Sequence, residues 1–116
     1  MTLPATDKCI NYIEFIVSDI QKTKDFYAKA FGWTYTDYGP TYTEFTDGQM
    51  KGGFEEGEPR TGGPLIVLYG TDLDALAKAV EEAGGTITKP NFEFPGGRRF
   101  EFKDPDGYDL AVWCEN

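Results

Sequence analysis

An internal duplication is the sequence feature that most constrains the fold of this chain. Residues 12–33 and 65–86 follow one pattern, in which an apolar strand leads through Ser-Asp or Thr-Asp into a helical stretch that ends at glycine. An aspartate that precedes a glycine by 13 residues occurs at Asp19 and again at Asp72, so an offset of 53 residues superimposes the two halves. A repeat of this kind indicates one supersecondary unit per copy, and the sequence therefore predicts two modules.

Composition limits the class of protein. A chain of 116 residues with 40% hydrophobic and 16% aromatic residues can bury a core. The net charge of −9 predicts no nucleic-acid partner and no binding to anionic membranes. No apolar run approaches the ~20 residues of a membrane span, and the polar start Met1–Lys8 does not resemble a signal peptide. Cys9 and Cys114 form no CxxC motif, which indicates reduced cysteines and a cytoplasmic location.

Alternation of apolar and polar residues predicts four strands in each module. Ile10–Val17 is the first strand, in which Tyr12 and Glu14 share one face and Phe15 lies on the other. The remaining strands are expected at Trp33–Asp37, Tyr42–Thr46, Gln49–Phe54, Leu65–Gly70, Thr86–Lys89, Arg99–Lys103 and Tyr108–Cys114.

One helix is predicted in each module. Ser18-Asp19-Ile20-Gln21 fits a capping box, in which the Ser18 hydroxyl and the Gln21 side chain satisfy free backbone amides, and Gly32 ends this helix. Thr71-Asp72-Leu73-Asp74 caps the second helix, which runs to Ala83-Gly84-Gly85.

These elements predict an α+β fold of two βαβββ modules. Module one covers about residues 9–54, residues 55–64 form a linker, and module two covers residues 65–115, all within a single domain. Each sheet would have one face covered by its helix and one bare face. Two bare faces turned toward each other would give an incomplete eight-stranded barrel around a cleft. A ferredoxin-like βαββαβ fold is the alternative, and it leaves Gln49–Phe54 or the last strand unexplained.

Several of these segments resemble the vicinal oxygen chelate superfamily, which includes glyoxalase I, extradiol dioxygenases, fosfomycin resistance enzymes and bleomycin-binding proteins. The segments are Lys24-Asp25-Phe26-Tyr27, Phe31-Gly32-Trp33, Asp72-Leu73-Asp74, Ala83-Gly84-Gly85 and Phe102-Lys103-Asp104-Pro105-Asp106-Gly107-Tyr108. Asp-Pro-Asp-Gly alone is a common turn, but its place before the last strand of a duplicated βαβββ chain makes the resemblance specific. The resemblance covers roughly residues 9–115.

The resemblance also implies where a metal would bind, because the metal enzymes of this superfamily use up to four ligands from the first and last strands of each module. Their motif positions correspond here to Tyr12, Leu65, Ala111 and Gly52, with Gly53 as the neighbour if the last position is shifted by one. Divalent metals need histidine, carboxylate or thiolate ligands, and the chain has no histidine. We therefore expect a member of the superfamily with no metal and no cofactor.

A different site is expected in the cleft if Tyr12 faces it. The predicted ligand-binding residues are Tyr12, Glu14, Met50, Phe54, Tyr69 and Trp113, with Val67 and Asp109 at matching positions and Trp33 near the rim. Aromatic walls with carboxylates suit a flat or cationic organic ligand. The alternative is that these aromatic residues fill a small interior.

Four charged residues have open roles. Glu44 and Glu101 correspond in the repeat and face either the cleft or its rim. Arg98 and Arg99 follow Gly96-Gly97, so they are expected in a loop, either solvated or available to an anionic substrate.

Three classes of function remain open at this stage. The first is a binding protein that sequesters or carries a small organic molecule, and the second is a metal-independent isomerase or lyase. The enzyme would use Glu14 as acid or base and Tyr12 as hydrogen-bond donor. In the third class the cleft is closed and the chain acts only through a dimer surface. The resemblance and the short chain also predict a homodimer.

Overall fold

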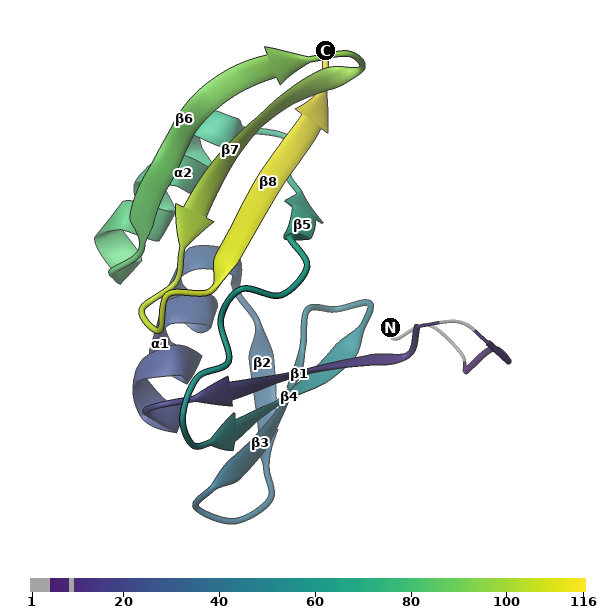
Figure 1. The fold of residues 1–116 in the computed structure, drawn as a ribbon, viewed down its shortest axis with the longest axis vertical. Helices are drawn as coiled ribbons and strands as arrows, with labels where there is room; N and C mark the ends of the chain where they lie inside the picture. The colour runs from purple at the N-terminus through teal and green to yellow at the C-terminus, as the bar shows by residue number, and fades with distance from the viewer. Residues whose placement is uncertain (1–4, 9) are drawn as a thin grey trace. The chain divides into compact units, whose positions relative to one another are not determined.

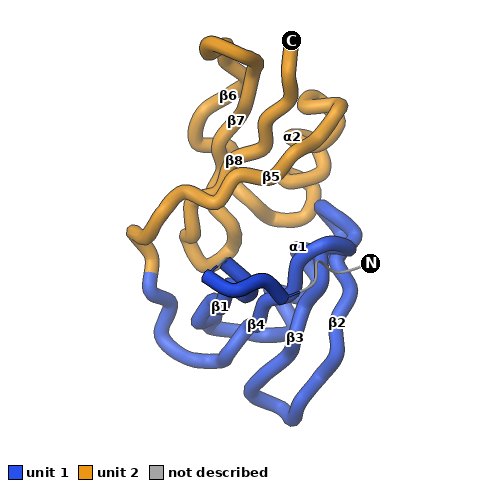
Figure 2. The backbone as a smooth tube through the Cα atoms, turned by 90° about the vertical axis from the view of Figure 1, so that its right-hand side faces the viewer, with its two compact units in different colours: residues 1–60 blue, residues 61–116 orange. Residues whose placement is uncertain are grey.

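The computed structural model describes residues 5–8 and 10–116, and it contains two compact units (Figures 1 and 2). Unit 1 comprises residues 1–60 and unit 2 comprises residues 61–116. Within these described residues, each unit contains one helix and one four-stranded sheet. No helix within the described part of the chain is long and apolar enough to cross a membrane. Cys114 is a free, buried thiol, whereas Cys9 lies outside the described residues.

Unit 1 is a βαβββ module. Its elements are β1 (Tyr12–Val17), α1 (Ile20–Phe31), β2 (Thr34–Asp37), β3 (Tyr42–Thr46) and β4 (Lys51–Glu56). The strand order is β1-β4-β3-β2, with β1 parallel to β4 and the other pairs antiparallel.

Unit 2 repeats this topology. Its elements are β5 (Ile66–Tyr69), α2 (Leu73–Ala83), β6 (Thr86–Phe94), β7 (Gly97–Lys103) and β8 (Asp109–Glu115). The strand order is β5-β8-β7-β6, with β5 parallel to β8. The α+β fold with two βαβββ modules is therefore confirmed, and the ferredoxin-like alternative is wrong. Closure of the two sheets into an incomplete barrel around a cleft stays a prediction.

The first helix begins one residue later than the capping-box prediction places it. Asp19, and not Ser18, is the N-cap of α1, and its carboxylate accepts a hydrogen bond from the Lys22 amide at 3.1 Å. Asp72 caps α2 in the same way, through the Ala75 amide at 3.1 Å. A carboxylate is also stabilised by the positive end of the helix dipole, which explains why aspartate is the N-cap in both modules.

Each sheet packs one face on its own helix, and we call this the helix face; the other is the opposite face. On the helix face of unit 1, Phe54 lies 5.7 Å from Phe15 and 5.5 Å from Tyr27 between ring centroids. Trp33 stacks between Tyr27 and Phe45 at 4.5 and 4.6 Å. Such contacts add to the burial of apolar area, so the core of unit 1 is a continuous aromatic cluster.

In unit 2, α2 packs on β6, β7 and β8 over an aliphatic and phenylalanine core. The buried residues of this core are Leu73, Val80, Phe100, Phe102, Leu110 and Val112. Strand β6 is longer than predicted, since it continues through Pro90 to Phe94 with register shifts on both sides of Lys89. Proline is tolerated there because β6 is the edge strand of its sheet.

Candidate functional site

Three side chains on the opposite face of unit 1 form a hydrogen-bonded chain. Tyr12 and Glu14 come from β1, and Tyr42 comes from the start of β3. The Tyr42 hydroxyl donates to Glu14 Oε1 at 2.9 Å, and the hydroxyl oxygens of Tyr12 and Tyr42 are 2.6 Å apart. Because the single Tyr42 proton is used in the bond to Glu14, the Tyr12 hydroxyl must donate to Tyr42. Proton donation therefore runs from Tyr12 to Tyr42 to Glu14.

Gly53 lies directly beneath the two tyrosine hydroxyls. It is paired with Glu14 on one side and with Glu44 on the other. A Cβ atom at this position would lie 1.9 Å from the Tyr42 hydroxyl oxygen and 2.8 Å from that of Tyr12. Only glycine leaves room for the hydrogen-bonded pair, so the backbone of β4 is part of the site.

The environment keeps Tyr42 protonated. Desolvation raises the pKa of its hydroxyl most, and the hydrogen bonds with Tyr12 and Glu14 raise the pKa further. A neutral Tyr42 preserves the direction of donation described above. The remaining lone pairs belong to the Tyr12 oxygen and the Glu14 carboxylate, and the Tyr12 side chain is 37% exposed. The arrangement thus offers hydrogen-bond acceptors to a molecule that approaches this face.

Tyr42 is the member of this chain that the sequence did not identify as a site residue. Its strand was predicted correctly as Tyr42–Thr46. The available signal was the alternation that places Tyr42 and Glu44 on the same face of β3.

Phe54 and Trp33 belong to the core and not to the predicted site. Phe54 pairs with Phe15 across β1 and β4 and is fully buried on the helix face, so the prediction that it lines a ligand site is wrong. Trp33 is 8% exposed within the same aromatic cluster, so its predicted place at a rim is also wrong. Met50 lies before β4, in the turn where its amide donates to the Asp47 carboxylate at 2.7 Å, and not in a strand as predicted.

Tyr69 and Trp113 lie together on the opposite face of unit 2. They are paired across β5 and β8, and their ring centroids are 5.3 Å apart in an edge-to-face arrangement. The Tyr69 hydroxyl donates to Glu115, and this hydrogen bond raises the pKa of Tyr69 and lowers the pKa of Glu115. Val67 shares this face and is 44% exposed. The role of Tyr69 and Trp113 in ligand binding stays a prediction.

The glutamates of the repeat occupy equivalent positions, and each lies beside a cation. Glu44 pairs with Gly53, and its carboxylate is 3.8 Å from Lys51 Nζ. Glu101 pairs with Ala111 and lies 2.8 Å from Arg99 Nη2. Arg98 and Arg99 both lie within β7, so the strand predicted from Arg99 is confirmed and begins two residues earlier, at Gly97, and the expectation of a loop at these arginines is wrong.

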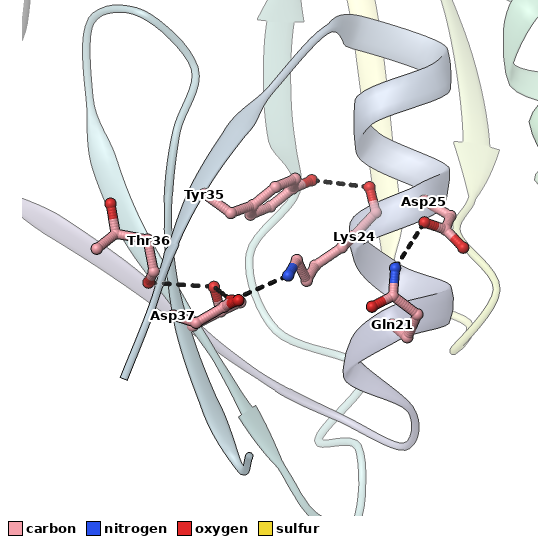
Figure 3. Close-up of polar contacts among 7 residues, drawn as sticks. Gln21, Lys24, Asp25, Tyr35, Thr36 and Asp37 are labelled. Atoms are coloured by element: carbon pink, nitrogen blue, oxygen red, sulfur yellow. Dashed lines mark hydrogen bonds and ion pairs between the residues drawn. The ribbon is translucent and has the colours of Figure 1, made fainter. Parts of the chain in front are cut away.

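A second polar cluster in unit 1 connects α1 with β2 (Figure 3). Lys24 Nζ lies 2.9 Å from Asp37 Oδ1, and the Tyr35 hydroxyl donates to the Lys24 carbonyl at 3.1 Å. The buried Thr43 hydroxyl also donates to Asp37 at 2.7 Å. The hydrogen bonds from Lys24 and Thr43 lower the pKa of Asp37. These contacts join a helix to its own sheet, so we assign the cluster a structural role.

The model of the Glyoxalase/Bleomycin resistance protein/Dioxygenase superfamily matches residues 9–112. The chain belongs to this superfamily. Membership gives it a family-level role in binding or modifying a small molecule.

Proteins of similar sequence include one from Streptomyces and one from Serratia marcescens. The anthracycline biosynthesis protein DauV of Streptomyces sp. (strain C5) is 36% identical over 82% of this chain and 42% of its own length. The glutathione transferase FosA of Serratia marcescens is 29% identical over 89% of this chain and 78% of its own length. The chain thus spans less than half of DauV and most of FosA.

Solved structures of glyoxalase-superfamily proteins share the fold. The fosfomycin resistance protein FosX of Listeria monocytogenes has a TM-score of 0.83 at 19% identity, and the match covers 96% of this chain and 93% of FosX. TioX from Micromonospora sp. ML1 has a TM-score of 0.74 at 18% identity, over 93% of this chain and 99% of TioX.

The side chains at the superfamily's metal-ligand positions do not fit a divalent ion. The register corrects one position, because β4 residue Gly53, and not Gly52, is equivalent to Ala111 of β8. The four residues at these positions contain no histidine, carboxylate or thiolate, and they are Tyr12, Gly53, Leu65 and Ala111. The described residues also contain no group of three or more His, Cys, Asp or Glu side chains that could hold a metal.

Proposed function

We propose that this chain is a metal-independent, small-molecule-binding member of the glyoxalase superfamily that sequesters or carries a small organic ligand. The observation that carries the proposal is the Tyr12–Tyr42–Glu14 chain over Gly53, where three polar side chains from two strands converge on the sheet face away from the core. A sheet face with a purely structural role does not need a glycine that accommodates two tyrosine hydroxyls.

The direction of hydrogen bonding in this chain favours a ligand that carries donors. The Tyr12 oxygen and the Glu14 carboxylate accept hydrogen bonds, so an ammonium group or a phenolic hydroxyl would complement them. The Tyr12 and Tyr42 rings add apolar and cation–π contacts to a flat or cationic molecule. The net charge of −9 also favours a cation over an anion at this site.

The relatives support the same class of ligand. DauV and its Streptomyces peucetius counterpart DnrV are named as anthracycline biosynthesis proteins, and anthracyclines are planar, phenolic molecules with an amino sugar. We therefore place planar aromatic compounds with amine or phenol groups first among the candidate ligands.

Replacing Glu14 with Gln tests the ligand-binding proposal. Daunorubicin, which carries an ammonium group, and 1,4-dihydroxyanthraquinone, which lacks it, serve as the probes. We expect the Glu14→Gln variant to bind daunorubicin about 10–100-fold more weakly, because a charge-assisted hydrogen bond contributes about 1.5–3 kcal/mol. Binding of 1,4-dihydroxyanthraquinone should change less, because that probe lacks the charge. Isothermal titration calorimetry measures both affinities.

Glu58→Gln is the matched control, because it removes the same charge at an exposed residue outside the sheet. Its affinity for daunorubicin should remain close to that of the unmodified protein. Equal affinities of the Glu14→Gln and Glu58→Gln variants would contradict the proposed role of Glu14.

The alternative function is a metal-independent isomerase or lyase step beside a carbonyl, with Glu14 as acid or base. The observation that favours it is the neutral Tyr42, whose hydroxyl donates a hydrogen bond to the Glu14 carboxylate and accepts one from Tyr12. Deuterium incorporation next to the carbonyl of a bound ligand, followed by NMR, would reveal this activity. Incorporation that Glu14→Gln leaves unchanged would argue against Glu14 as the base.

We expect the purified protein to contain no stoichiometric transition metal. The reason is that the superfamily's metal-ligand positions carry one phenol and no strong metal ligand in this chain. These positions are Tyr12, Gly53, Leu65 and Ala111. Elemental analysis by inductively coupled plasma mass spectrometry makes the measurement. A content near one zinc, nickel, manganese or iron per chain would contradict the expectation.

We also propose that the protein is a cytoplasmic homodimer. A second copy would bury additional apolar surface for a small chain, and Val67 and Tyr69 are large, exposed side chains on one strand. Sedimentation velocity at micromolar concentration should give the mass of two chains. A single species near the 13.0 kDa of one chain would exclude the dimer.

A further inference from the structure

Arg99 lies on the opposite face of unit 2 among aromatic rings from neighbouring strands. Its guanidinium carbon is 5.4 Å from the Phe92 ring centroid and 5.9 Å from that of Phe94. Phe94 is in turn 6.4 Å from Trp113, which is paired with Arg99 across β7 and β8. We call Phe92, Phe94, Arg99 and Trp113 the arginine–aromatic cluster. Its members come from the three consecutive strands β6, β7 and β8.

The hydrogen-bonding capacity of this guanidinium is only partly used. Arg99 Nη2 donates to Glu101 at 2.8 Å, and guanidinium has five N–H donors in all. Arg99 Nε is buried and has no hydrogen-bond partner in the described part of the chain. The side chain is 32% exposed, so one part of the cation is shielded by rings and another part is accessible.

The contrast with Arg98 shows that this environment is specific to one residue. Arg98 is the preceding residue of β7, and it is exposed. Alternation along the strand places its side chain on the other side of the sheet from Arg99. Two adjacent arginines with the same charge therefore have different surroundings, and only Arg99 is enclosed by aromatic rings.

We propose that the arginine–aromatic cluster binds the carboxylate or phenolate group of a planar aromatic compound. The guanidinium supplies a planar set of donors that matches a carboxylate, and the surrounding rings strengthen this attraction by excluding water. The half-exposed edges of Trp113 and Tyr69 provide a surface for the ring system of the ligand. Glu101 orients the guanidinium through Nη2, and the donors on the accessible part of the guanidinium remain for the anion. All residues of this cluster belong to unit 2, whereas Glu14 belongs to unit 1.

The test uses anthraquinone-2-carboxylate as the probe and anthraquinone-2-carboxamide as its uncharged counterpart. Binding is followed by quenching of tryptophan fluorescence, since Trp113 is half-exposed in the cluster and the only other tryptophan, Trp33, is buried. We expect the carboxylate to bind about tenfold more tightly than the carboxamide. Arg99→Gln should remove this difference. Arg98→Gln, which removes the same charge, should preserve the difference to within about twofold.

Two results would overturn the proposal. The first is an Arg99→Gln variant that still binds the carboxylate more tightly than the carboxamide. The second is an Arg98→Gln variant that loses this preference as fully as Arg99→Gln does, because such a loss would indicate a general charge effect. If Arg99→Gln does not fold, Arg99→Lys keeps the charge and removes the planar set of donors. That variant should lose about three- to tenfold in affinity for the carboxylate, and unchanged affinity would contradict the proposed geometry.

Discussion

Replacing Phe54 with Ala is expected to lower the free energy of unfolding by about 3–5 kcal/mol. The ring is fully buried on the helix face of unit 1, where it contacts Phe15, Tyr27 and Phe45 at centroid distances of 5.7, 5.5 and 4.9 Å. Removal of the ring leaves a cavity between the sheet and α1 that rigid aromatic neighbours cannot fill. Urea denaturation followed by circular dichroism gives the change in stability.

Tyr69→Ala provides the comparison for this prediction. Tyr69 is also aromatic and lies in a strand, but 54% of it is exposed, so its truncation removes much less buried area. The loss in the free energy of unfolding should therefore be much smaller for Tyr69→Ala than for Phe54→Ala. Equal losses of stability in the two variants would mean that Phe54 is not in the core of unit 1.

Replacing Gly52 with Ala should be the other strongly destabilising substitution. A Cβ atom at this residue would lie 2.2 Å from the Phe45 ring and 2.3 Å from the backbone oxygen of Ile13. The aromatic ring can move, but the Ile13 oxygen belongs to the strand paired with β4, so relief of the clash must distort the sheet. We expect a loss of about 1–3 kcal/mol or more, the range for overpacked cores, measurable by the same denaturation experiment.

Gly63→Ala is the control for this substitution. A Cβ atom at Gly63 would meet no atom within 4 Å beyond its immediate chain neighbours, and the φ of Gly63 is outside the left-handed region. The stability of this variant should remain within about 0.5 kcal/mol of the unmodified protein or increase slightly, because alanine restricts the unfolded chain. A Gly52→Ala variant as stable as Gly63→Ala would show that β1 and β4 are less closely paired than described.

The sequence was sufficient for the topology because its signals were redundant. The repeated aspartate cap, the glycine after each helix and the apolar strand before it all indicate the same βαβββ order. The prediction that Phe15 lies on the other face of the strand from Tyr12 and Glu14 is confirmed, because β1 alternates along its whole length.

The position of Phe54 was not predictable in the same way. Gly52 and Gly53 interrupt the alternation of β4 with two residues that have no side chain, so the sequence gives no indication of which residue faces the helix. An error of one residue moves every side chain of a strand to the other face. The pairing of Phe54 with Phe15 across two strands resolves this ambiguity, and such pairing is a property of the folded sheet.

The hydrogen-bonded chain of Tyr12, Tyr42 and Glu14 was also not predictable, because it too depends on how the strands pair in the folded sheet. Tyr42 is 28 residues from Glu14 and 30 residues from Tyr12, and β4 lies between the strands that carry them. Contact between β1 and β3 across an intervening strand requires the glycine at Gly53, which lets both phenols cross over the backbone of β4. No local sequence pattern reports a contact of this kind.

The strand registers make Tyr42 and Arg99 counterparts in the duplicated fold. Tyr42 pairs with Glu55, Arg99 pairs with Trp113, and Glu55 and Trp113 are themselves equivalent through Ile16 and Tyr69 of the first strands. The same position of the repeat therefore carries a neutral phenol in one copy and a permanent cation in the other. Each copy has its own helix, core and sheet, so a substitution on the opposite face of one sheet leaves the core residues of the other copy unchanged. The repeat therefore gives protein engineers two equivalent strand positions, one in each sheet, at which different functional groups can be placed within a chain of 116 residues.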